Sequence, residues 1–212
     1  MTEHILDQPA RQFLDALASD APTPGGGSVA AFTGAMAAGL LVMVCDLTIG
    51  KKTYAEFEAE AVALRQRAEA ARQTLQQLAQ DDIDVFGRLS ATYKLPKTTD
   101  ADAATRRAAI QTVTKQATVV PLRMARALAD LAPLCVPLAA NGSRLAVSDV
   151  GVAAHLIRAA VPAALLNVEI NLAALEDQMF VRETRAHVQD ITGGLDNELD
   201  RVIAIVAERI TV

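Results

Sequence analysis

Aromatic residues are scarce in this sequence, and their scarcity argues against a β-rich fold. They make up 3% of the chain and include no tryptophan, although 51% of the residues are hydrophobic. Most of that hydrophobic content is Ala, Leu and Val. Alanine favours helices, whereas strands are enriched in aromatic and β-branched residues. We therefore expect an all-α protein.

Cysteine and histidine are too few for several kinds of site. The two cysteines, Cys45 and Cys135, cannot form a disulfide framework or a four-ligand zinc site. The three histidines are scattered along the chain. We therefore expect no metal site.

An excess of basic charge is also missing. The chain has 20 basic and 25 acidic side chains, a net charge of −5. A nucleic-acid binder needs a strongly basic face, so we expect no nucleic-acid partner. The first residues, MTEHILDQPARQF, carry charges where a signal peptide needs an apolar core. We expect a soluble, cytoplasmic protein.

Proline and glycine predict where the loops lie. Loops are expected at Pro22–Gly27, Lys94–Ala103 and Asn141–Ser143, with a possible break at Gly193-Gly194. No linker or tandem repeat is visible, so one domain is expected over residues 1–212. Besides the two long helices described next, helices are predicted at about Ile5–Ala18, Ala101–Val120, Pro121–Leu131, Ser148–Leu175 and Asp177–Arg209.

The segment Val29–Cys45 contains seventeen residues without a charge. A membrane span needs about 20 apolar residues, and Asp46 interrupts the run. Small residues recur every four positions, which lets other helices approach closely. We predict a central helix buried in a single-domain bundle. A small membrane protein that needs detergent for solubility is the alternative.

The segment Tyr54–Tyr93 carries a heptad pattern typical of a long packed helix. Such a helix would measure about 55–60 Å. It would pack against its own bundle or against another subunit. The seam positions are Tyr54, Phe57, Ala61, Leu64, Ala68, Ala71, Leu75, Leu78, Asp82, Val85, Leu89 and Thr92.

Asp82 is the only ionisable carboxylate in that seam. Burying a carboxylate is costly unless it is paired, and burial raises its pKa. The residue could fix the register, form an ion pair between helices, or transfer protons in a cavity. Asp81 and Asp84 have a different helical phase and are expected at the surface.

The sequence PTPGGGS at Pro22–Ser28 leads into the central helix. Backbone N–H groups at a helix start suit an anion or a closely bound ligand. The lysine of a P-loop is missing. The alternative is a tight connection between helices that is capped by Ser28.

Three further groups of polar residues could bind a ligand. Lys51 and Lys52 could stabilise a helix C-terminus or bind a carboxylate tail. Asn167 and Asn171, four residues apart, could bridge helices or hold a polar heterocycle. Asp149 could bind a ligand or act as a helix cap.

Six segments, in consistent order from about residue 10 to 190, resemble a known family. They are PTPGGGS at Pro22–Ser28, LTIGKKTY at Leu47–Tyr54, DDxxxF at Asp81–Phe86, YKLPK at Tyr93–Lys97, VSDVGVAA at Val147–Ala154 and NVEIN at Asn167–Asn171. The chain resembles the cyclodeaminase domain of formiminotransferase-cyclodeaminase. It is equally similar to the stand-alone bacterial methenyltetrahydrofolate cyclohydrolase.

The resemblance implies an all-helical homodimer that binds a tetrahydrofolate substrate in a groove near the subunit interface. It places the family's catalytic aspartate at Asp82, and implies no metal and no cofactor beyond the folate. One departure is Asp46, where the family often has Asn, which puts a negative charge near the lysines. The substrate-binding residues implied are Pro24, Gly25, Gly26, Gly27, Ser28, Lys51, Lys52, Tyr54, Asp149, Asn167 and Asn171.

Two reactions of the family fit these residues. In cyclodeamination, N10 of 5-formiminotetrahydrofolate attacks the formimino carbon and ammonia leaves, giving 5,10-methenyltetrahydrofolate. In the cyclohydrolase reaction, water opens the methenyl bridge to 10-formyltetrahydrofolate. We favour cyclodeamination, with hydrolysis as the alternative. A non-catalytic helical interaction module remains the alternative from another class, and it predicts no folate binding.

Overall fold

The structure is a computed structural model that describes residues 5–211, and every regular element in that range is helical. The prediction of an all-α protein is confirmed. The α-helices are α1 (Ala10–Leu17), α2 (Gly26–Thr48), α3 (Glu58–Tyr93), α4 (Asp100–Ala129), α5 (Ala132–Asn141), α6 (Val147–Ala173), α7 (Gln178–Thr192) and α8 (Leu195–Thr211). Short 3₁₀ turns, η1 to η3, lie at Ile5–Asp7, Lys52–Phe57 and Arg144–Ala146.

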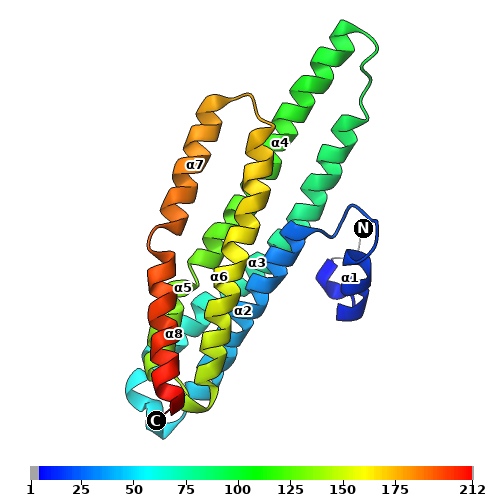
Figure 1. The fold of residues 1–212 in the computed structure, drawn as a ribbon. Coiled ribbons are helices and arrows are strands. Elements are labelled where there is room, and N and C mark those ends of the chain that lie inside the picture. The colour runs from blue at the N-terminus through cyan, green and yellow to red at the C-terminus, as the bar shows by residue number, and fades with distance from the viewer. Residues whose placement is uncertain (1–4, 212) are drawn as a thin grey trace.

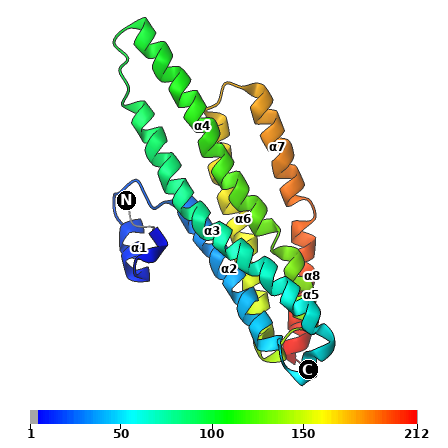
Figure 2. The same cartoon turned by 180° about the vertical axis from the view of Figure 1, so that it is seen from behind.

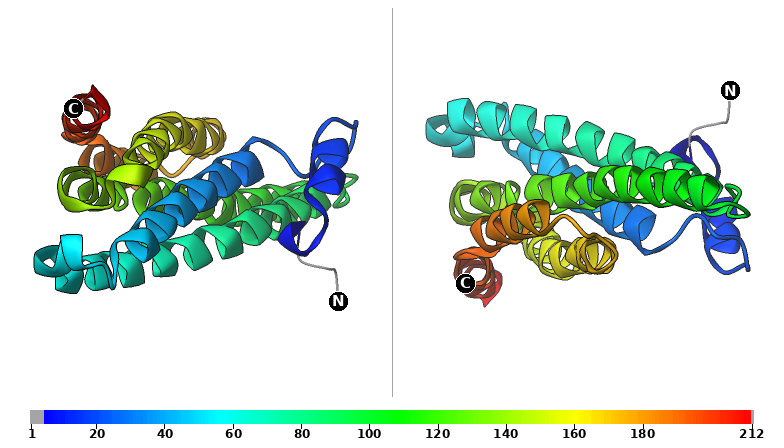
Figure 3. Two further views of the ribbon diagram at one scale, coloured as in Figure 1. Left: turned by 90° about the horizontal axis from the view of Figure 1, so that it is seen from below. Right: turned by 90° about the horizontal axis from the view of Figure 1, so that it is seen from above.

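Four long helices, α2, α3, α4 and α6, form an elongated bundle (Figure 1). The loop joining α3 to α4 projects beyond one end of it. Seen from behind, α3 and α4 form the near layer (Figure 2). The views along the bundle place α1 and the α7–α8 arm at opposite sides of the molecule (Figure 3).

Helix α2 packs against α3 and α6 through small residues. Ala31, Ala37 and Ala38 have no exposed surface, which confirms a buried central helix. One face of α2 is left uncovered by residues 5–211, because Met36, Met43 and Leu47 are 38–44% exposed. Because the sequence of α2 is apolar on every side, it does not show which face packs inside the subunit and which apolar face stays exposed.

Two helical stretches, α2 and Arg144–Ala173, are long and apolar enough to span a membrane. More than half of the α2 window, 56%, is buried inside the bundle. Core helices of soluble proteins pass the same test of length and composition.

The heptad seam of α3 packs inside its own subunit. Ala61, Leu64, Leu75 and Leu78 are at most 5% exposed, and α3 packs on α2 and α4. The choice left open by the sequence is therefore decided in favour of the chain's own bundle. The 36 residues of α3 correspond to about 54 Å. Tyr54 and Phe57 precede α3, in the 3₁₀ turn η2.

The sequence predicts that Pro121 separates two helices, but α4 is continuous across it. A proline has no N–H, so the carbonyl four residues earlier, at Ala117, loses its helical partner. The Asn171 Nδ2 of α6 donates to this carbonyl at 2.9 Å. The expected break is therefore wrong, because a neighbouring helix satisfies the freed group.

The start of α6 and the segment that forms α5 also differ from the sequence expectation. The N-cap of α6 is Ala146, so Asp149 lies in the first helical turn and is not the cap. The list of predicted helices does not include α5, which contains Pro137. The break at Gly193-Gly194 is present, since α7 ends at Thr192 and Gly194 has a φ of +80°.

We predict that Gly34→Val destabilises the fold. A Cβ at Gly34 would clash with the Leu128 side chain and lie 3.1 Å from Leu75 Cδ1. Overpacking of this kind costs about 1–3 kcal/mol. Gly39→Ala is the matched control, because its Cβ would meet only Arg72 Cδ at 3.9 Å. Chemical denaturation should show Gly39→Ala to be more stable than the parent by about 0.5–1 kcal/mol.

Candidate functional site

A cavity of about 460 Å³ lies where the start of α2 meets α3, α4 and α6. This volume is within the range of small-molecule sites. Its lining combines polar groups with apolar and aromatic side chains. The lining residues are Pro22, Thr23, Gly25, Gly26, Gly27, Asp82, Val85, Phe86, Leu89, Tyr93, Thr114, Ala117, Asn167, Ile170, Asn171 and Ala174.

The Asp82 carboxylate lies against the first turn of α2. The Ser28 Oγ donates to Asp82 Oδ2 at 3.3 Å. A Cβ on Gly27 would lie 2.5 Å from both carboxylate oxygens, so only glycine admits the carboxylate here. The N-cap of α2 is Gly25. The proposed Ser28 cap is therefore wrong, since Ser28 lies inside the helix and binds Asp82.

Burial raises the pKa of the Asp82 carboxyl above its ordinary value, while hydrogen bonds from the Ser28 hydroxyl and backbone oppose the rise. Burial favours the protonated acid. The N–H donors and positive end of α2 stabilise the carboxylate. A carboxyl under these opposing influences is suited to take up and release a proton. Asp81 and Asp84, as expected, point elsewhere and accept hydrogen bonds from Gln77 and Gln80.

Asn167 and Asn171 are the polar side chains of α6 that line the cavity. The Asn167 Nδ2 donates to the Ala163 carbonyl at 3.0 Å, and Asn171 Nδ2 is held by Ala117 on α4. These bonds fix both amides and leave each Oδ1 as an acceptor for a ligand N–H. Gly26 lies beside this pair, because a Cβ there would be 3.9 Å from Asn167 Nδ2. Asn171 therefore both bridges two helices and lines the cavity.

The fold brings together one group of the predicted site residues. Gly25, Gly26, Gly27 and Asp82 line the cavity with both asparagines, and Ser28 contacts Asp82. Pro24 is buried between two lining residues, Thr23 and Gly25. These residues come from three separate stretches of the sequence.

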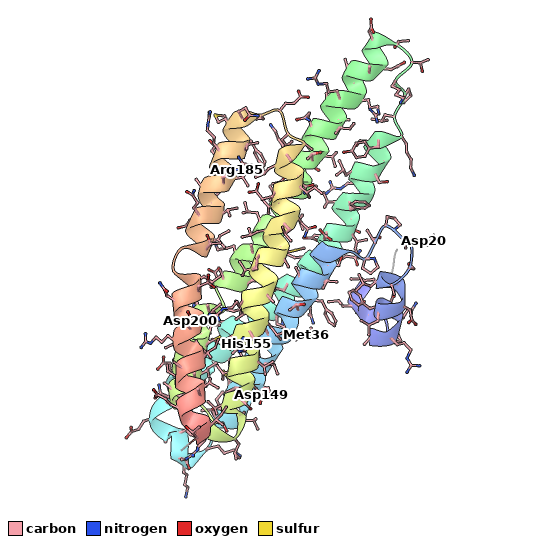
Figure 4. All side chains as sticks on the ribbon, in the orientation of Figure 1. Asp20, Met36, Asp149, His155, Arg185 and Asp200 are labelled. Carbon is pink, nitrogen blue, oxygen red and sulfur yellow. The ribbon has the colours of Figure 1, made fainter. Side chains whose placement is uncertain are left out.

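A second group of predicted residues lies at the other end of the bundle. Lys51 and Lys52 follow the C-terminus of α2, and the 23 residues of α2 correspond to about 35 Å. The Tyr54 Oη accepts from the Arg144 backbone N–H at 3.0 Å. Asp149 lies at the same end, on the first turn of α6 (Figure 4). Within one subunit these residues do not reach the cavity.

The departure at Asp46 has a local explanation. Arg65 Nε lies 2.5 Å from Asp46 Oδ1, so the carboxylate is paired across α2 and α3. Its charge is compensated by Arg65, and the adjacent lysines are not needed for that purpose.

Several cavity residues were not identified as site residues from the sequence. Val85, Phe86 and Leu89 follow Asp82 at helical spacing and share its face, so this periodicity could have revealed them. No sequence pattern marks Thr114 and Ala117 as site residues. They reach the cavity because α4 packs against α6, and neither segment alone predicts that packing.

Cysteine and metal chemistry find little support in the described range. Burial raises the pKa of the Cys45 thiol to about 11 and that of Cys135 to about 12, so neither is a thiolate at neutral pH. Residues 5–211 contain no group of three or more His, Cys, Asp or Glu side chains placed to hold a metal ion.

Comparisons with known proteins agree with the resemblance seen in the sequence. The profile of the formiminotransferase-cyclodeaminase family matches residues 9–190. Methenyltetrahydrofolate cyclohydrolase of Methylorubrum extorquens is 39% identical over 93% of this chain and 95% of its own length. Formimidoyltransferase-cyclodeaminase of Sus scrofa is 35% identical over 89% of this chain, which spans 35% of that longer protein.

A solved structure has the same fold along nearly the whole chain. The crystal structure of formiminotetrahydrofolate cyclodeaminase from Thermotoga maritima superposes with a TM-score of 0.86 at 29% identity. The match covers 97% of this chain and 99% of that one.

We predict that Asp82→Asn does not lower thermal stability at neutral pH. Because burial raises the pKa of folded Asp82, the folded state binds more protons than the unfolded state from about pH 4 up to the raised pKa. Stability attributable to Asp82 therefore falls as pH rises through this window. Melting curves should show a larger gain for Asp82→Asn at pH 7.5 than at pH 4.5. Asp84→Asn, which alters an exposed carboxylate on the same helix, is the control.

Proposed function

The chain belongs to the formiminotransferase-cyclodeaminase family, and we propose that it is a folate enzyme acting on the one-carbon unit between N5 and N10 of tetrahydrofolate. The observation that carries this proposal is Asp82, held in the cavity by Gly27 and Ser28. We propose that the protein is soluble and cytoplasmic and needs no cofactor besides its folate substrate.

Asp82 would move the proton in either reaction of this family. Both reactions pass through a tetrahedral carbon between N5 and N10, and both require a proton on or off nitrogen or oxygen. A buried carboxyl whose pKa is raised above its ordinary value can serve as a general acid and base, which contributes about 10²–10⁴-fold to rate. The Ser28 hydroxyl would keep the carboxylate oriented during the transfer.

The cavity walls suit the folate head better than its tail. Phe86 and Tyr93, 41% and 51% exposed, lie where a flat aromatic ring can contact them. The lining includes one carboxylate and neither Lys nor Arg among the described residues. The carboxylates of a glutamate tail would therefore extend out of the cavity toward solvent or a second subunit.

Of the two reactions, we propose methenyltetrahydrofolate hydrolysis as the principal one. The relative with that name is 39% identical and matches along nearly its whole length, without an attached domain. Cyclodeamination, which the sequence favoured, remains the second candidate. It is supported by the name of the Thermotoga maritima protein, whose chain is matched along 99% of its length.

We expect purified protein to open 5,10-methenyltetrahydrofolate at least tenfold more efficiently, by kcat/KM, than it deaminates 5-formiminotetrahydrofolate. Absorbance of the methenyl compound and release of ammonia measure the two reactions. Asp82→Asn should reduce either turnover by at least about two orders of magnitude, whereas Asp81→Asn should not. Turnover of neither folate would contradict the proposed function. The opposite ratio would make cyclodeamination the principal reaction.

We also propose that the protein is a homodimer that pairs through the uncovered face of α2 and α6, called here the α2–α6 face. Met36 and His155, one on each helix, lie on the same side of the molecule (Figure 4). The face follows heptad steps on both helices, as helices that pack together do. Its residues are Val29, Thr33, Met36, Leu40, Met43 and Leu47 of α2 and Val152, Leu156, Ala159, Ala163, Leu166 and Ile170 of α6.

A second copy is the occupant that best fits the α2–α6 face. Identical apolar stripes are self-complementary across a twofold axis. The face is continuous with the site, because Ile170 belongs to both the stripe and the cavity lining. In an antiparallel pair, the Lys51 end of one copy would approach the cavity of the other.

We predict that the parent protein is a dimer in light scattering and that Met36→Glu together with Leu166→Glu yields a 22.4 kDa monomer. Both residues are exposed apolar side chains on the α2–α6 face, 44% and 72% exposed. Val62→Glu, at an exposed apolar position on α3, should leave the mass of the dimer unchanged. A fully active monomeric parent would exclude this interface.

We predict that Lys51→Met and Lys52→Met raise KM with little change in kcat, because a tail carboxylate is bound alike in ground and transition states. In the proposed dimer the lysines reach only the site of the partner subunit, so co-expression of Asp82→Asn subunits with the double lysine variant should restore one intact site per mixed dimer. A large kcat loss at unchanged KM would instead place a lysine beside the reacting carbon.

A further inference from the structure

Thr114 differs from the other threonines of α4 in what its hydroxyl does. Helix α4 contains four threonines, and in three of them the hydroxyl donates to the carbonyl four residues earlier. These three are Thr105, Thr112 and Thr118. The Thr114 Oγ1 has no hydrogen-bond partner within residues 5–211.

The unpaired Thr114 hydroxyl is not exposed to bulk water. Thr114 is 1% exposed, and its Oγ1 is buried. An unpaired buried hydroxyl is unfavourable, and natural structures rarely keep one without a reason. Because Thr114 lines the cavity, a molecule bound there could supply the missing partner.

The neighbours of Thr114 indicate which part of a folate it would meet. One turn along α4, the Ala117 carbonyl holds Asn171, and Asn171 lies four residues from Asn167 on α6. Thr114, Asn167 and Asn171 are the polar side chains that α4 and α6 contribute to the cavity, whereas the α3 residues that line it, apart from Asp82, are apolar or aromatic. A planar heterocycle with several N–H and C=O groups matches those polar side chains, whereas the charged tail does not.

We propose that Thr114 is a substrate-binding residue whose hydroxyl hydrogen-bonds the pterin ring of the folate. The inference rests on the proposed function and extends it to the orientation of the substrate. The Asn167 and Asn171 amides contact the same ring and hold N5 and its one-carbon unit toward Asp82. The unpaired hydroxyl in the free protein is then a preorganised contact that becomes satisfied when the substrate binds.

The test compares Thr114→Val, which keeps the shape and removes the hydroxyl, with Thr114→Ser, which keeps the hydroxyl. The assay measures turnover of 5,10-methenyltetrahydrofolate and of 5-formiminotetrahydrofolate, and inhibition by 6-methyltetrahydropterin, which has the ring and no tail. Thr48→Val is the matched control. Thr48 is fully buried at the far end of α2, and its Oγ1 donates to Val44 and accepts from the Ser143 N–H.

We expect Thr114→Val to raise KM and the inhibition constant of the pterin together, by about 5- to 20-fold, with kcat changed less than threefold. Its melting temperature should equal or exceed that of the parent, because an unpaired buried hydroxyl is removed. Thr114→Ser should keep the parent's constants. Thr48→Val should melt at a lower temperature and keep the parent's KM.

Three outcomes would overturn the inference. Parent-like KM and pterin inhibition in Thr114→Val would show that the hydroxyl does not touch the ring. A fall in kcat alone, with pterin inhibition unchanged, would assign the hydroxyl to the reacting water. A lower melting temperature with unchanged inhibition would make the role structural. Failure of the proposed function is distinct, because the parent itself would then neither turn over either folate nor bind the pterin.

Discussion

The site depends on one contact, the packing of the Asp82 carboxylate against the first turn of α2. Gly27 leaves room for the two carboxylate oxygens, and Ser28 donates a hydroxyl to one of them. The contact places opposing influences on a single group, since burial disfavours its charge while the helix start favours it. A proton donor and acceptor therefore arises without a metal ligand, a cysteine or a histidine in contact with Asp82 among the described residues.

The part of the cavity lined by α4 and α6 is built around an interruption in the hydrogen bonding of α4. Pro121 cannot donate to the Ala117 carbonyl, and Asn171 of α6 donates in its place. This exchange holds α4 to α6, fixes the Asn171 amide at the cavity and keeps the helix continuous. This single replacement of a backbone hydrogen bond by a side-chain hydrogen bond thus supports both the fold and the shape of the site. It lies close to the unpaired hydroxyl of Thr114.

The apolar sequence of α2 also serves two purposes. Its small residues allow α3 and α6 to approach, so the helix forms the centre of the bundle. Its remaining apolar side joins that of α6 as an uncovered face that leads to Ile170 at the cavity. In the proposed dimer this face would both close the apolar surface and bring a second subunit's lysines to the substrate's tail.

The sequence by itself determined the all-α class, the presence of the long α3 helix with its end at Tyr93, and the anomaly of Asp82, because periodicity and composition are local properties. The six motifs also identified the family, since their order along the chain is itself sequence information. Only the tertiary structure decided that α3 packs within its own subunit, that α4 passes through Pro121, and that Lys51 and Asp149 lie far from Asp82. Each of these features depends on which helices pack together and in what register along the bundle. The sequence did not single out Thr114 for the same reason. Thr114 stands out only because its buried hydroxyl has no hydrogen-bond partner among the described residues of the folded protein.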